Sequence, residues 1–510
     1  MDKKQIVSLL MDNNVLVSPD AIENLSEEAL AKMLEDVKGK DLLVFNKDTE
    51  AMISKNIEWK EFEVSKTMME KGNSKPYDHF LGLKDEVKEI PKIKVTSLYE
   101  TESKKRTLKD FVSLFNARYE SMESLLSKRM EMTNLTTVSR LLNKKDRDTI
   151  SLIVMVVDKQ TTKNGNLMLT VEDPTGATKV LISKNKPDLF QQAKDIVFDE
   201  MIAVIGVNGD NIIFANNVLW PEVPLTKELK KSPVEAYAIF LSDMHVGSTN
   251  FLPDDFNKFL KWINGELGND KQKEIASKIR YAFIVGDLVD GCGIYPGQED
   301  ELTIKDITEQ YAECARLLKQ IPKHVNIIVC PGNHDAMRIA EPQPPLYQDF
   351  AAALYELPNV THVSNPAIVN IHASEDFSGF DVLMYHGYSF DYYVANVDSI
   401  RNNGGYDRGD LIMKFLLKKR HLAPTHTSTL YVPQDSDDLV IKNVPDIFVT
   451  GHIHKSIAAN YRNITLISGS CWQSKTSFQE KVGHNPEPSR VPIVNLKTRE
   501  VKILRFGSNE

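Results

Sequence analysis

The sequence lacks an apolar run long enough to cross a lipid bilayer. A spanning helix needs about 20 consecutive apolar residues, and the 510-residue chain contains no such run. The start of the chain (MDKKQIVSLLMDNNVLV) also has neither a long apolar core nor a small-residue cleavage site, so it does not read as a secretory signal. We therefore expect a cytoplasmic protein with no membrane contact.

Cysteine is scarce, and basic residues are not in excess. The four cysteines are scattered without a C-x-x-C pair, which argues against a disulfide framework or a zinc ribbon and favours a reducing compartment. The formal net charge at pH 7 is -9. A protein that grips DNA alone usually presents a basic face, because neutralised phosphates supply most of the non-specific affinity. The composition therefore disfavours autonomous DNA binding and is compatible with an enzyme that receives its substrate from a partner.

The length predicts a multidomain protein, since single hydrophobic cores stop growing beyond about 300 residues. Residues 1–45 show helical spacing and helix caps, which predicts a small N-terminal helical domain. Residues 46–106 are charged and aperiodic, as expected of a tether. Residues 107–145 return to helical spacing and predict a helical segment.

Residues 146–225 change to a period of two. Five short β-rich runs occur here, and a polar, helix-prone insert separates the third run from the fourth. Five strands with a helix in that place predict the β-barrel called an OB-fold. Such barrels often bind single strands by stacking bases on aromatic rings, but Phe214 and Trp220 are the only aromatic residues in these runs. We therefore favour a structural or subunit-contact role for the barrel.

Residues 235–506 alternate apolar strands with helical stretches, which predicts an α/β sandwich. Polar residues of metal-binding type stand at the ends of five apolar strands: Asp243 with His245, Asp287, Asn333 with His334, His386, and His452 with His454. Ligands collect at the carboxyl ends of strands in open α/β sheets, so we expect these side chains to meet at one edge. Each short motif alone is weak evidence, because strand-end Asp and His are common turn formers. All five in this order indicate a site.

These residue types suit a pair of metal ions. Two ions about 3.5–4 Å apart clamp the attacking and leaving oxygens of a phosphoryl displacement, and a carboxylate must bridge them. Asp287 is the natural bridge. One of the two later histidines would join Asp243 and His245, and the other would join Asn333 and His386. Imidazole, carboxylate and amide oxygen together suit manganese, iron or zinc better than calcium.

The order D-x-H, G-D, G-N-H-D, H, G-H-x-H resembles the calcineurin-like metallophosphoesterase family, and in particular its nucleases. The resemblance implies two groups of ligands: Asp243, His245, Asp287 and His454 for one ion, and Asp287, Asn333, His386 and His452 for the other. It also implies that His334 stays outside the ligand shell, where it steadies the transition state or protonates the leaving oxygen. Many relatives carry a histidine where this chain has Asp290, which leaves the handling of the leaving group open.

Further stretches, among them GDLVDGCGIYPGQ and GSCWQSKTSFQEKVGHNPEP, resemble the small subunits of archaeal family-D DNA polymerases. The resemblance implies a two-metal 3′→5′ exonuclease, usually with manganese, that proofreads for a large catalytic subunit during DNA replication. The implied partners are that large subunit, DNA at the primer 3′ end and, through the complex, the sliding clamp, although no clear clamp-binding peptide stands out. Within the chain, the best candidates for a phosphate contact are Lys418, Lys419, Arg420 and His421, with a solvated helix end as the alternative.

Other interpretations stay open. A free-standing metallophosphoesterase or a repair nuclease would use the same ligands, but a free-standing phosphatase has no need of the preceding barrel and tether, and the break-repair nuclease has its phosphoesterase domain near the N-terminus. A non-catalytic scaffold subunit is a third possibility, which the complete set of ligands disfavours.

Overall fold

The computed structural model describes residues 16–17, 44–45, 93–99, 104–142, 147–209, 211–481 and 483–507. These residues belong to two compact units, Met1–Pro91 and Lys92–Glu510. In the first unit the described residues form a parallel pair of strands, β1 (Leu16–Val17) and β2 (Val44–Phe45). The helical domain predicted at 1–45 and most of the tether predicted at 46–106 lie outside the described residues. No helix in the described part of the chain is both long and apolar enough to span a bilayer.

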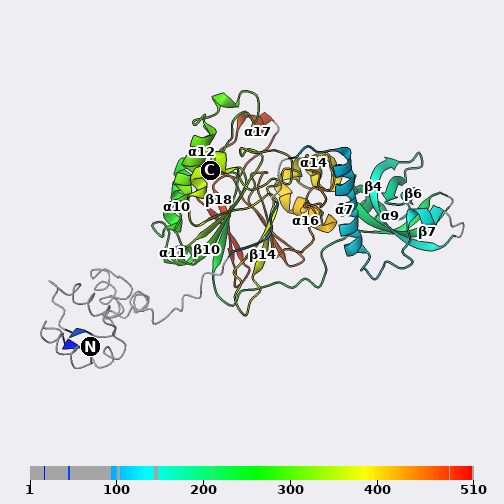
Figure 1. Ribbon diagram of the computed structural model, residues 1–510, viewed down its shortest axis with the longest axis horizontal. Helices are drawn as coiled ribbons and strands as arrows, with labels where there is room; N and C mark the ends of the chain where they lie inside the picture. Colours follow the sequence, from blue (N-terminus) through cyan, green and yellow to red (C-terminus); the bar gives the residue numbers. More distant parts are fainter. Residues whose placement is uncertain are drawn as a thin grey trace. The chain divides into compact units, whose positions relative to one another are not determined.

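Five strands of the second unit close into a barrel, in the order β4-β5-β6-β8-β7 (Figure 1). Their bounds are Thr149–Thr161 (β4), Leu167–Asp173 (β5), Gly176–Ile182 (β6), Met201–Asn208 (β7) and Ile213–Leu219 (β8). The helix α9 (Pro187–Lys194) stands between β6 and β7 in the chain. Alternate residues, such as Leu169 and Val171 of β5, fill the interior, since successive side chains of a strand point to opposite faces. The predicted five-stranded barrel is confirmed.

Two six-stranded sheets form the largest part of the second unit, in the orders β12-β11-β10-β9-β18-β19 and β16-β17-β15-β14-β13-β3. The strands of the first sheet are Tyr237–Leu241 (β9), Ile279–Val285 (β10), Asn326–Cys330 (β11), Val360–His362 (β12), Arg490–Asn495 (β18) and Val501–Arg505 (β19). The strands of the second sheet are Lys94–Ser97 (β3), Ala367–Ile371 (β13), Phe380–Met384 (β14), Ile447–Thr450 (β15), Ile457–Tyr461 (β16) and Ile464–Ser468 (β17). In the first sheet β9, β10, β11 and β12 are parallel to one another, and in the second sheet β14, β15 and β17 are parallel.

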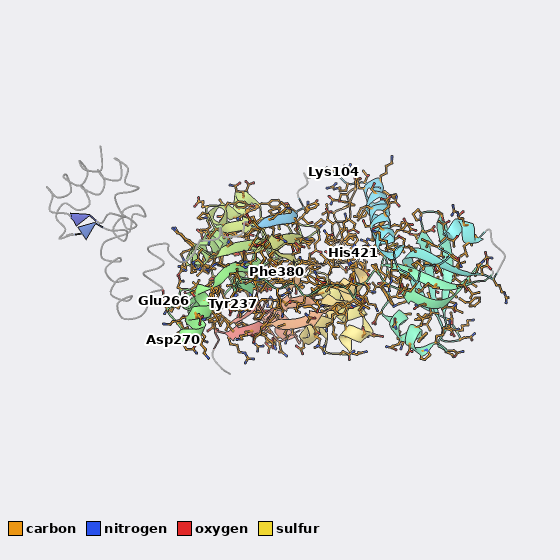
Figure 2. The ribbon with its side chains drawn as sticks, turned by 90° about the horizontal axis from the view of Figure 1, so that it is seen from below. Lys104, Tyr237, Glu266, Asp270, Phe380 and His421 are labelled. Carbon is orange, nitrogen blue, oxygen red and sulfur yellow. The ribbon has the colours of Figure 1, made fainter. Side chains whose placement is uncertain are left out.

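Helices cover the outer face of each sheet, and the inner faces pack against each other. The first sheet carries α10 (Pro253–Ile263), α11 (Asp270–Ser277), α12 (Ile307–Leu318) and α13 (Gln348–Tyr355). The second carries α14 (Phe390–Asn396), α15 (Asp398–Arg401) and α16 (Gly409–Lys419). Phe240, Phe283 and Phe380 belong to the apolar layer between the sheets, and Figure 2 labels Phe380. The predicted α/β sandwich is confirmed.

The strand β3 corrects the predicted tether at its C-terminal end. Residues Lys94–Ser97 pair with β13 and form the outer strand of the second sheet. Val95 packs against the layer between the sheets, while the other β3 side chains are exposed. An exposed lysine on an edge strand is a common guard against edge-to-edge pairing, and Lys94 is the one charged residue of β3.

The helix α7 (Leu108–Leu126) lies between the barrel and the helices of the second sheet (Figure 1). Its Arg118 is buried, and its Nε donates a hydrogen bond to the carboxylate of Asp437 at 2.7 Å. Nε2 of His421, labelled beside α7 in Figure 2, lies 2.9 Å from the same carboxylate oxygen. One guanidinium nitrogen of Arg118 also donates to the main-chain carbonyl of Pro424 at 2.7 Å. A buried ion pair therefore joins α7 to the sandwich.

The basic run at residues 418–421 is part of the same junction. Lys419 is buried and pairs with Glu200 of the barrel. Arg420 is 3% exposed, and its Nε donates to a main-chain carbonyl at 2.7 Å. The Lys418 ammonium lies 3.7 Å from the centroid of the indole ring that follows β8. The predicted phosphate contact is wrong for this run, because its charges are buried against the barrel and its own domain.

Replacing Arg118 by methionine is expected to lower the free energy of unfolding by about 3–5 kcal/mol, because Asp437 would remain buried without its main counter-charge. Urea denaturation followed by circular dichroism would measure the change. Arg316, which pairs with Glu313 on the exposed face of α12, is the matched control, and its replacement by methionine should change stability by less than about 1 kcal/mol. Equal effects of the two substitutions would contradict the assignment of a stabilising junction.

Candidate metal centre

The candidate ligands lie just beyond the carboxyl ends of five strands. In the first sheet Asp243 follows β9, Asp287 follows β10 and Asn333 follows β11. In the second sheet His386 follows β14 and His452 follows β15. Parallel strands end at the same edge of a sheet, so both sheets deliver their polar residues to one edge of the sandwich.

Five of the candidate ligands have a left-handed backbone conformation. Their φ values are +50° at Asp243, +49° at His245, +51° at Asp287, +68° at His452 and +51° at His454. Each such conformation costs a residue with a side chain roughly 1–2 kcal/mol. Strain of this kind persists where the surrounding fold enforces it and is concentrated at functional sites. Five of the fifteen described non-glycine residues with a positive φ are therefore candidate ligands.

Two glycines allow the strand ends to approach one another closely. A Cβ atom on Gly332 would overlap the Asp287 carboxylate, and a Cβ atom on Gly286 would overlap the His386 imidazole. Gly286 also has a φ of +79°. Glycine is required here because the backbone runs directly against the side chains of the site.

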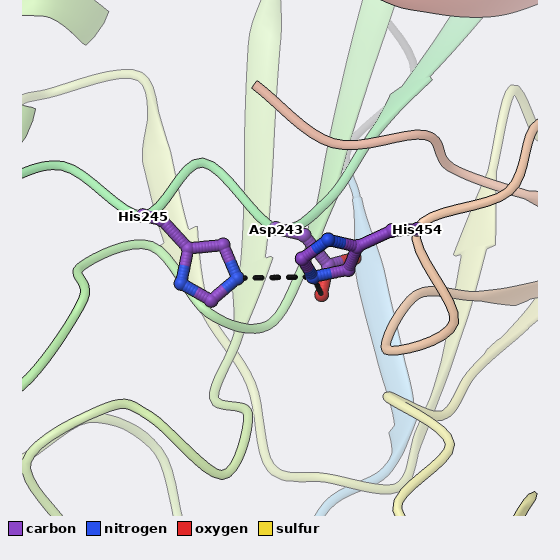
Figure 3. Close-up of side chains that lie close together, drawn as sticks. All are labelled: Asp243, His245 and His454. Atoms are coloured by element: carbon purple, nitrogen blue, oxygen red, sulfur yellow. Dashed lines mark hydrogen bonds and ion pairs between the residues drawn. The ribbon is translucent and has the colours of Figure 1, made fainter. Parts of the chain in front are cut away.

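The first group of donor atoms comes from Asp243, His245 and His454 (Figure 3). All three residues are buried. Nε2 of His245 lies 3.1 Å from Nε2 of His454, and the latter nitrogen lies 3.4 Å from Oδ1 of Asp243. The Asp287 carboxylate is 3.9 Å from Nε2 of His245, which places it next to this group.

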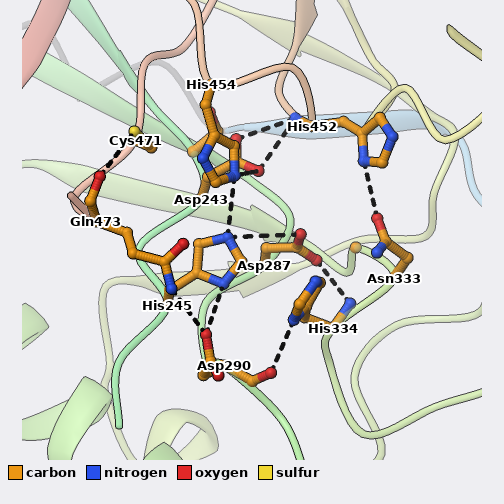
Figure 4. Close-up of polar contacts among 12 residues, drawn as sticks. Asp243, His245, Asp287, Asp290, Asn333, His334, His452, His454, Cys471 and Gln473 are labelled. Carbon is orange, nitrogen blue, oxygen red and sulfur yellow. Dashed lines mark hydrogen bonds and ion pairs between the residues drawn. The ribbon is translucent and has the colours of Figure 1, made fainter. Parts of the chain in front are cut away.

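The second group comes from Asp287, Asn333, His386 and His452 (Figure 4 labels three of them). Nε2 of His386 lies 3.3 Å from Oδ2 of Asp287 and 3.0 Å from Oδ1 of Asn333. Nδ1 of His452 lies 3.0 Å from the same Asn333 oxygen. Asp287 thus stands between the two groups, and the structure brings all seven predicted ligands together.

The charges of these groups fit a bound cation. Asp243 and Asp287 are 0% and 1% exposed, and their described contacts include histidines but no lysine or arginine. Burial raises the pKa of Asp243, but the His454 and His386 imidazoles hold it below its ordinary value. Although burial lowers the pKa of His386, the charge of Asp287 raises it to about 10. Buried carboxylates and imidazole nitrogens turned toward one another are the donor set of divalent transition metals.

His334 lies beside both groups without completing either of them. Its main-chain N–H donates to Oδ1 of Asp287 at 2.8 Å, and its ring centroid is 4.7 Å from that of His245. Burial lowers the pKa of His334 below its ordinary value, partly opposed by the charge of Asp287. His245, Asp287 and His334 also form a third set of donor atoms within 4.8 Å of one another. A ligand role for His334 is therefore an alternative that metal binding can test.

Three polar residues near the site were not predicted as functional: Asp391, Gln479 and Asp335, of which only Asp335 belongs to a quoted motif, as the last residue of G-N-H-D. Oδ2 of Asp391 lies 3.0 Å from Nε2 of His452, and Nε2 of Gln479 lies 2.9 Å from Nδ1 of His454. Asp335 accepts a hydrogen bond from the Gly332 N–H at 2.8 Å, so it shapes the turn that carries Asn333. Asp391 and Gln479 lie on short helices, and no spacing pattern links them to the histidines that they contact.

Comparisons with known proteins agree with this site. Residues 238–456 match the family model described as calcineurin-like phosphoesterase. A DNA polymerase II small subunit from Methanothermobacter thermautotrophicus is 39% identical over 399 residues, which cover 78% of this chain and 79% of that protein. The corresponding protein of Archaeoglobus fulgidus is 36% identical over 402 residues, 78% of each chain. That of Pyrococcus furiosus is 38% identical over 402 residues, 78% of this chain and 64% of that protein.

The match to these relatives spans most of the chain, and the match to the phosphoesterase model covers the strands that carry the candidate ligands. The fold, the edge at which the ligands meet and the sequence similarity all point to the same assignment. This chain therefore belongs to the family of archaeal DNA polymerase II small subunits, and its C-terminal region is a metallophosphoesterase domain.

Proposed function

We propose that this chain is a two-metal 3′→5′ exonuclease that removes nucleotides from a DNA primer end for a large polymerase subunit. The observation that carries the proposal is the pair of donor groups that share Asp287, five of whose residues are held in left-handed conformations. A structural role alone does not account for seven polar side chains turned toward one another with no lysine or arginine among the described contacts of the two carboxylates. Membership of a DNA polymerase subunit family supports DNA as the substrate.

The residues would divide between two ions as follows: Asp243, His245, Asp287 and His454 for one, and Asp287, Asn333, His386 and His452 for the other. When bound, the ions would polarise the phosphate and activate water as the nucleophile. Manganese is the proposed metal, and iron and zinc also fit this mixture of imidazole, carboxylate and amide oxygen.

The chain's own residues would orient the phosphate and handle protons. Water adds to phosphorus and the bond to the 3′ oxygen of the preceding nucleotide breaks, so that a nucleoside 5′-monophosphate and a shortened strand form. The departing 3′ oxygen needs a proton. His334 is the group that we assign to it, because its ring lies next to His245 and its N–H is anchored on Asp287. General acid catalysis of this kind contributes about 10²–10⁴-fold to a rate.

The net charge of -9 supports a division of labour with a partner. A large catalytic subunit would hold most of the DNA and feed a frayed 3′ end to the site, since the chain lacks a general excess of basic residues. We assign the five-stranded barrel as an OB-fold with a structural role, because the barrel packs on α7 and pairs Glu200 with Lys419 of the sandwich. A sliding clamp would be reached through the complex.

The proposal is tested with a 5′-labelled primer carrying a 3′ mismatch, annealed to a template, in the presence of Mn²⁺. Stepwise shortening from the 3′ end is expected with the unmodified chain and its large subunit. Asn333→Ala and His454→Ala, each of which removes a ligand of a different ion, are both expected to abolish it. Asn326→Ala, at the start of β11, is the matched control for the asparagine and should leave the ladder unchanged.

Three outcomes of this assay would contradict the proposal. Equal activity in the two ligand variants would overturn the site. Preference for a small phosphomonoester over DNA would favour a free-standing phosphatase. Stable assembly with a large subunit without metal-dependent cleavage would favour a scaffold.

A further inference from the structure

Asp290 is a carboxylate beside the metal site, and its side chain is 1% exposed. It comes three residues after the shared ligand Asp287 and is therefore close to both metal groups. We propose that Asp290 is a positioning residue that fixes the orientation of two imidazoles, that of His245 through its carboxylate and that of His334 through its main-chain carbonyl. The inference rests on the proposed two-metal site and adds to it the part that holds one ion's ligand in place.

Two glutamine amides and one imidazole nitrogen surround the Asp290 carboxylate, and Figure 4 labels Gln473 and His245 among these residues. Nδ1 of His245 lies 3.2 Å from Oδ1. Nε2 of Gln473 donates to the same oxygen at 3.0 Å, and Nε2 of Gln298 donates to Oδ2 at 2.9 Å. An ionised carboxylate accepts at both oxygens and donates at neither, so it matches this environment.

The carboxylate determines which nitrogen of His245 can bind a metal ion. Nδ1 of His245 is buried, is hydrogen-bonded to no residue that the structure describes, and has the Asp290 carboxylate as an ion-pair partner at 3.2 Å. Beside an acceptor such as Asp290, Nδ1 carries the proton, and Nε2 keeps its lone pair. That Nε2 faces His454 and lies 3.1 Å from its Nε2. A carboxylate behind a histidine is the usual arrangement for a metal ligand, because it fixes the ring and raises its basicity.

The main-chain carbonyl of Asp290 fixes the orientation of the imidazole of His334, the proposed acid. Nδ1 of His334 lies 2.8 Å from this oxygen, which can only accept, so Nδ1 keeps its proton and the proton given to the departing oxygen is the second one, carried on Nε2 of the imidazolium. Nε2 of Gln298 also donates to the carbonyl, at 2.9 Å. The imidazole rings of His245 and His334 meet edge to face, with an angle of 87° between their planes. One residue thus orients imidazoles on both sides of it.

Two buried glutamines hold Asp290 itself. Gln298 is 0% exposed, and its Oε1 accepts the Ile294 N–H at 2.8 Å, which determines the orientation of its amide. Gln473 is 4% exposed, and its Nε2 also donates to Oγ of Ser248 at 2.9 Å. Both glutamines therefore turn their NH₂ groups toward Asp290. A histidine at this position could not accept from all these donors, whereas an ionised carboxylate can.

The test is Asp290→Asn, measured by calorimetric titration of Mn²⁺ into the full chain without DNA. Asparagine keeps the shape and the main-chain carbonyl but offers a single acceptor oxygen and places an NH₂ group against the donors. The unmodified chain should bind two ions. In the variant one ion should bind about 10–100-fold more weakly, and the other should keep its affinity. Asp391→Asn is the matched comparison, because it removes the carboxylate beside His452 and should weaken the other ion instead.

Unchanged binding of both ions by Asp290→Asn would overturn the inference, and so would an equal loss of both ions. Should Asp290→Asn fail to fold, Gln473→Met is the second variant, because it removes the NH₂ group that donates to the Asp290 carboxylate. It should weaken binding of the same ion by a smaller factor. Unchanged affinity for that ion would then overturn the inference. The titration contains no DNA, so it tests metal binding alone. If the proposed exonuclease activity were absent, the unmodified chain would still bind two ions in the titration but would not shorten the primer in the cleavage assay.

Discussion

Replacing Asp287 by asparagine is expected to abolish binding of both metal ions and to lower the rate of DNA cleavage by about 10³-fold or more. Asparagine has the same shape and can still accept the N–H of His334, which lies 2.8 Å from Oδ1 in the unmodified chain. It offers one neutral oxygen in place of two charged ones, so it cannot bridge two ions. Metal ions supply several kcal/mol of transition-state stabilisation, and each 1.36 kcal/mol corresponds to a factor of about ten in rate.

Thermal unfolding with and without Mn²⁺ measures the loss of binding directly. Ligands that bind only the folded state raise its stability, so the unmodified chain should melt at a higher temperature when Mn²⁺ is added. Asp287→Asn should show no such increase. Asp254→Asn, which changes an exposed carboxylate in the first turn of α10, should behave like the unmodified chain. An increase of the same size in Asp287→Asn would show that Asp287 is not the bridge.

Replacing His334 by alanine is expected to lower kcat by about 10²–10⁴-fold while both ions bind normally. The expectation follows from its position beside both donor groups, with its ring anchored on the carbonyl of Asp290 at 2.8 Å. Steady-state cleavage of the mismatched primer gives kcat, and calorimetric titration of Mn²⁺ gives the affinities. His426→Ala, at an exposed histidine paired with Asp199, is the control and should leave both quantities unchanged.

The opposite result for His334 is equally informative. Loss of one ion in His334→Ala would assign this histidine to the ligand shell, in agreement with the third set of donor atoms that it forms with His245 and Asp287. Normal kcat with normal metal binding would remove His334 from the chemistry altogether.

The sequence allowed the candidate site to be predicted because its residues stand at strand ends. An apolar run identifies a strand, and the polar residue that follows it must lie at the carboxyl edge, as Asp243, Asp287 and His386 do. The barrel was predictable for a related reason. Its inward positions alternate along each strand, as in Leu167, Leu169 and Val171 of β5.

Contacts between segments that are far apart in the chain were not predictable. The run at residues 418–421 has the composition of a phosphate-binding patch, but Lys419 meets Glu200, a partner that no local pattern reveals. Residues Lys94–Ser97, which end a charged stretch of the sequence, form an edge strand only because β13 offers a free edge. Gln473 reaches Asp290 from 183 residues away. Such pairings depend on the packed fold, and composition alone cannot identify them.

The most direct test of the two-metal site is a crystal structure of the full chain grown with Mn²⁺ and measured at the manganese absorption edge. We expect two anomalous peaks about 3.5–4 Å apart, with the Asp287 carboxylate between them. One peak should lie within bonding distance of His245 and His454, and the other within bonding distance of Asn333 and His386. A single peak, or two peaks of which neither contacts Asp287, would contradict the account.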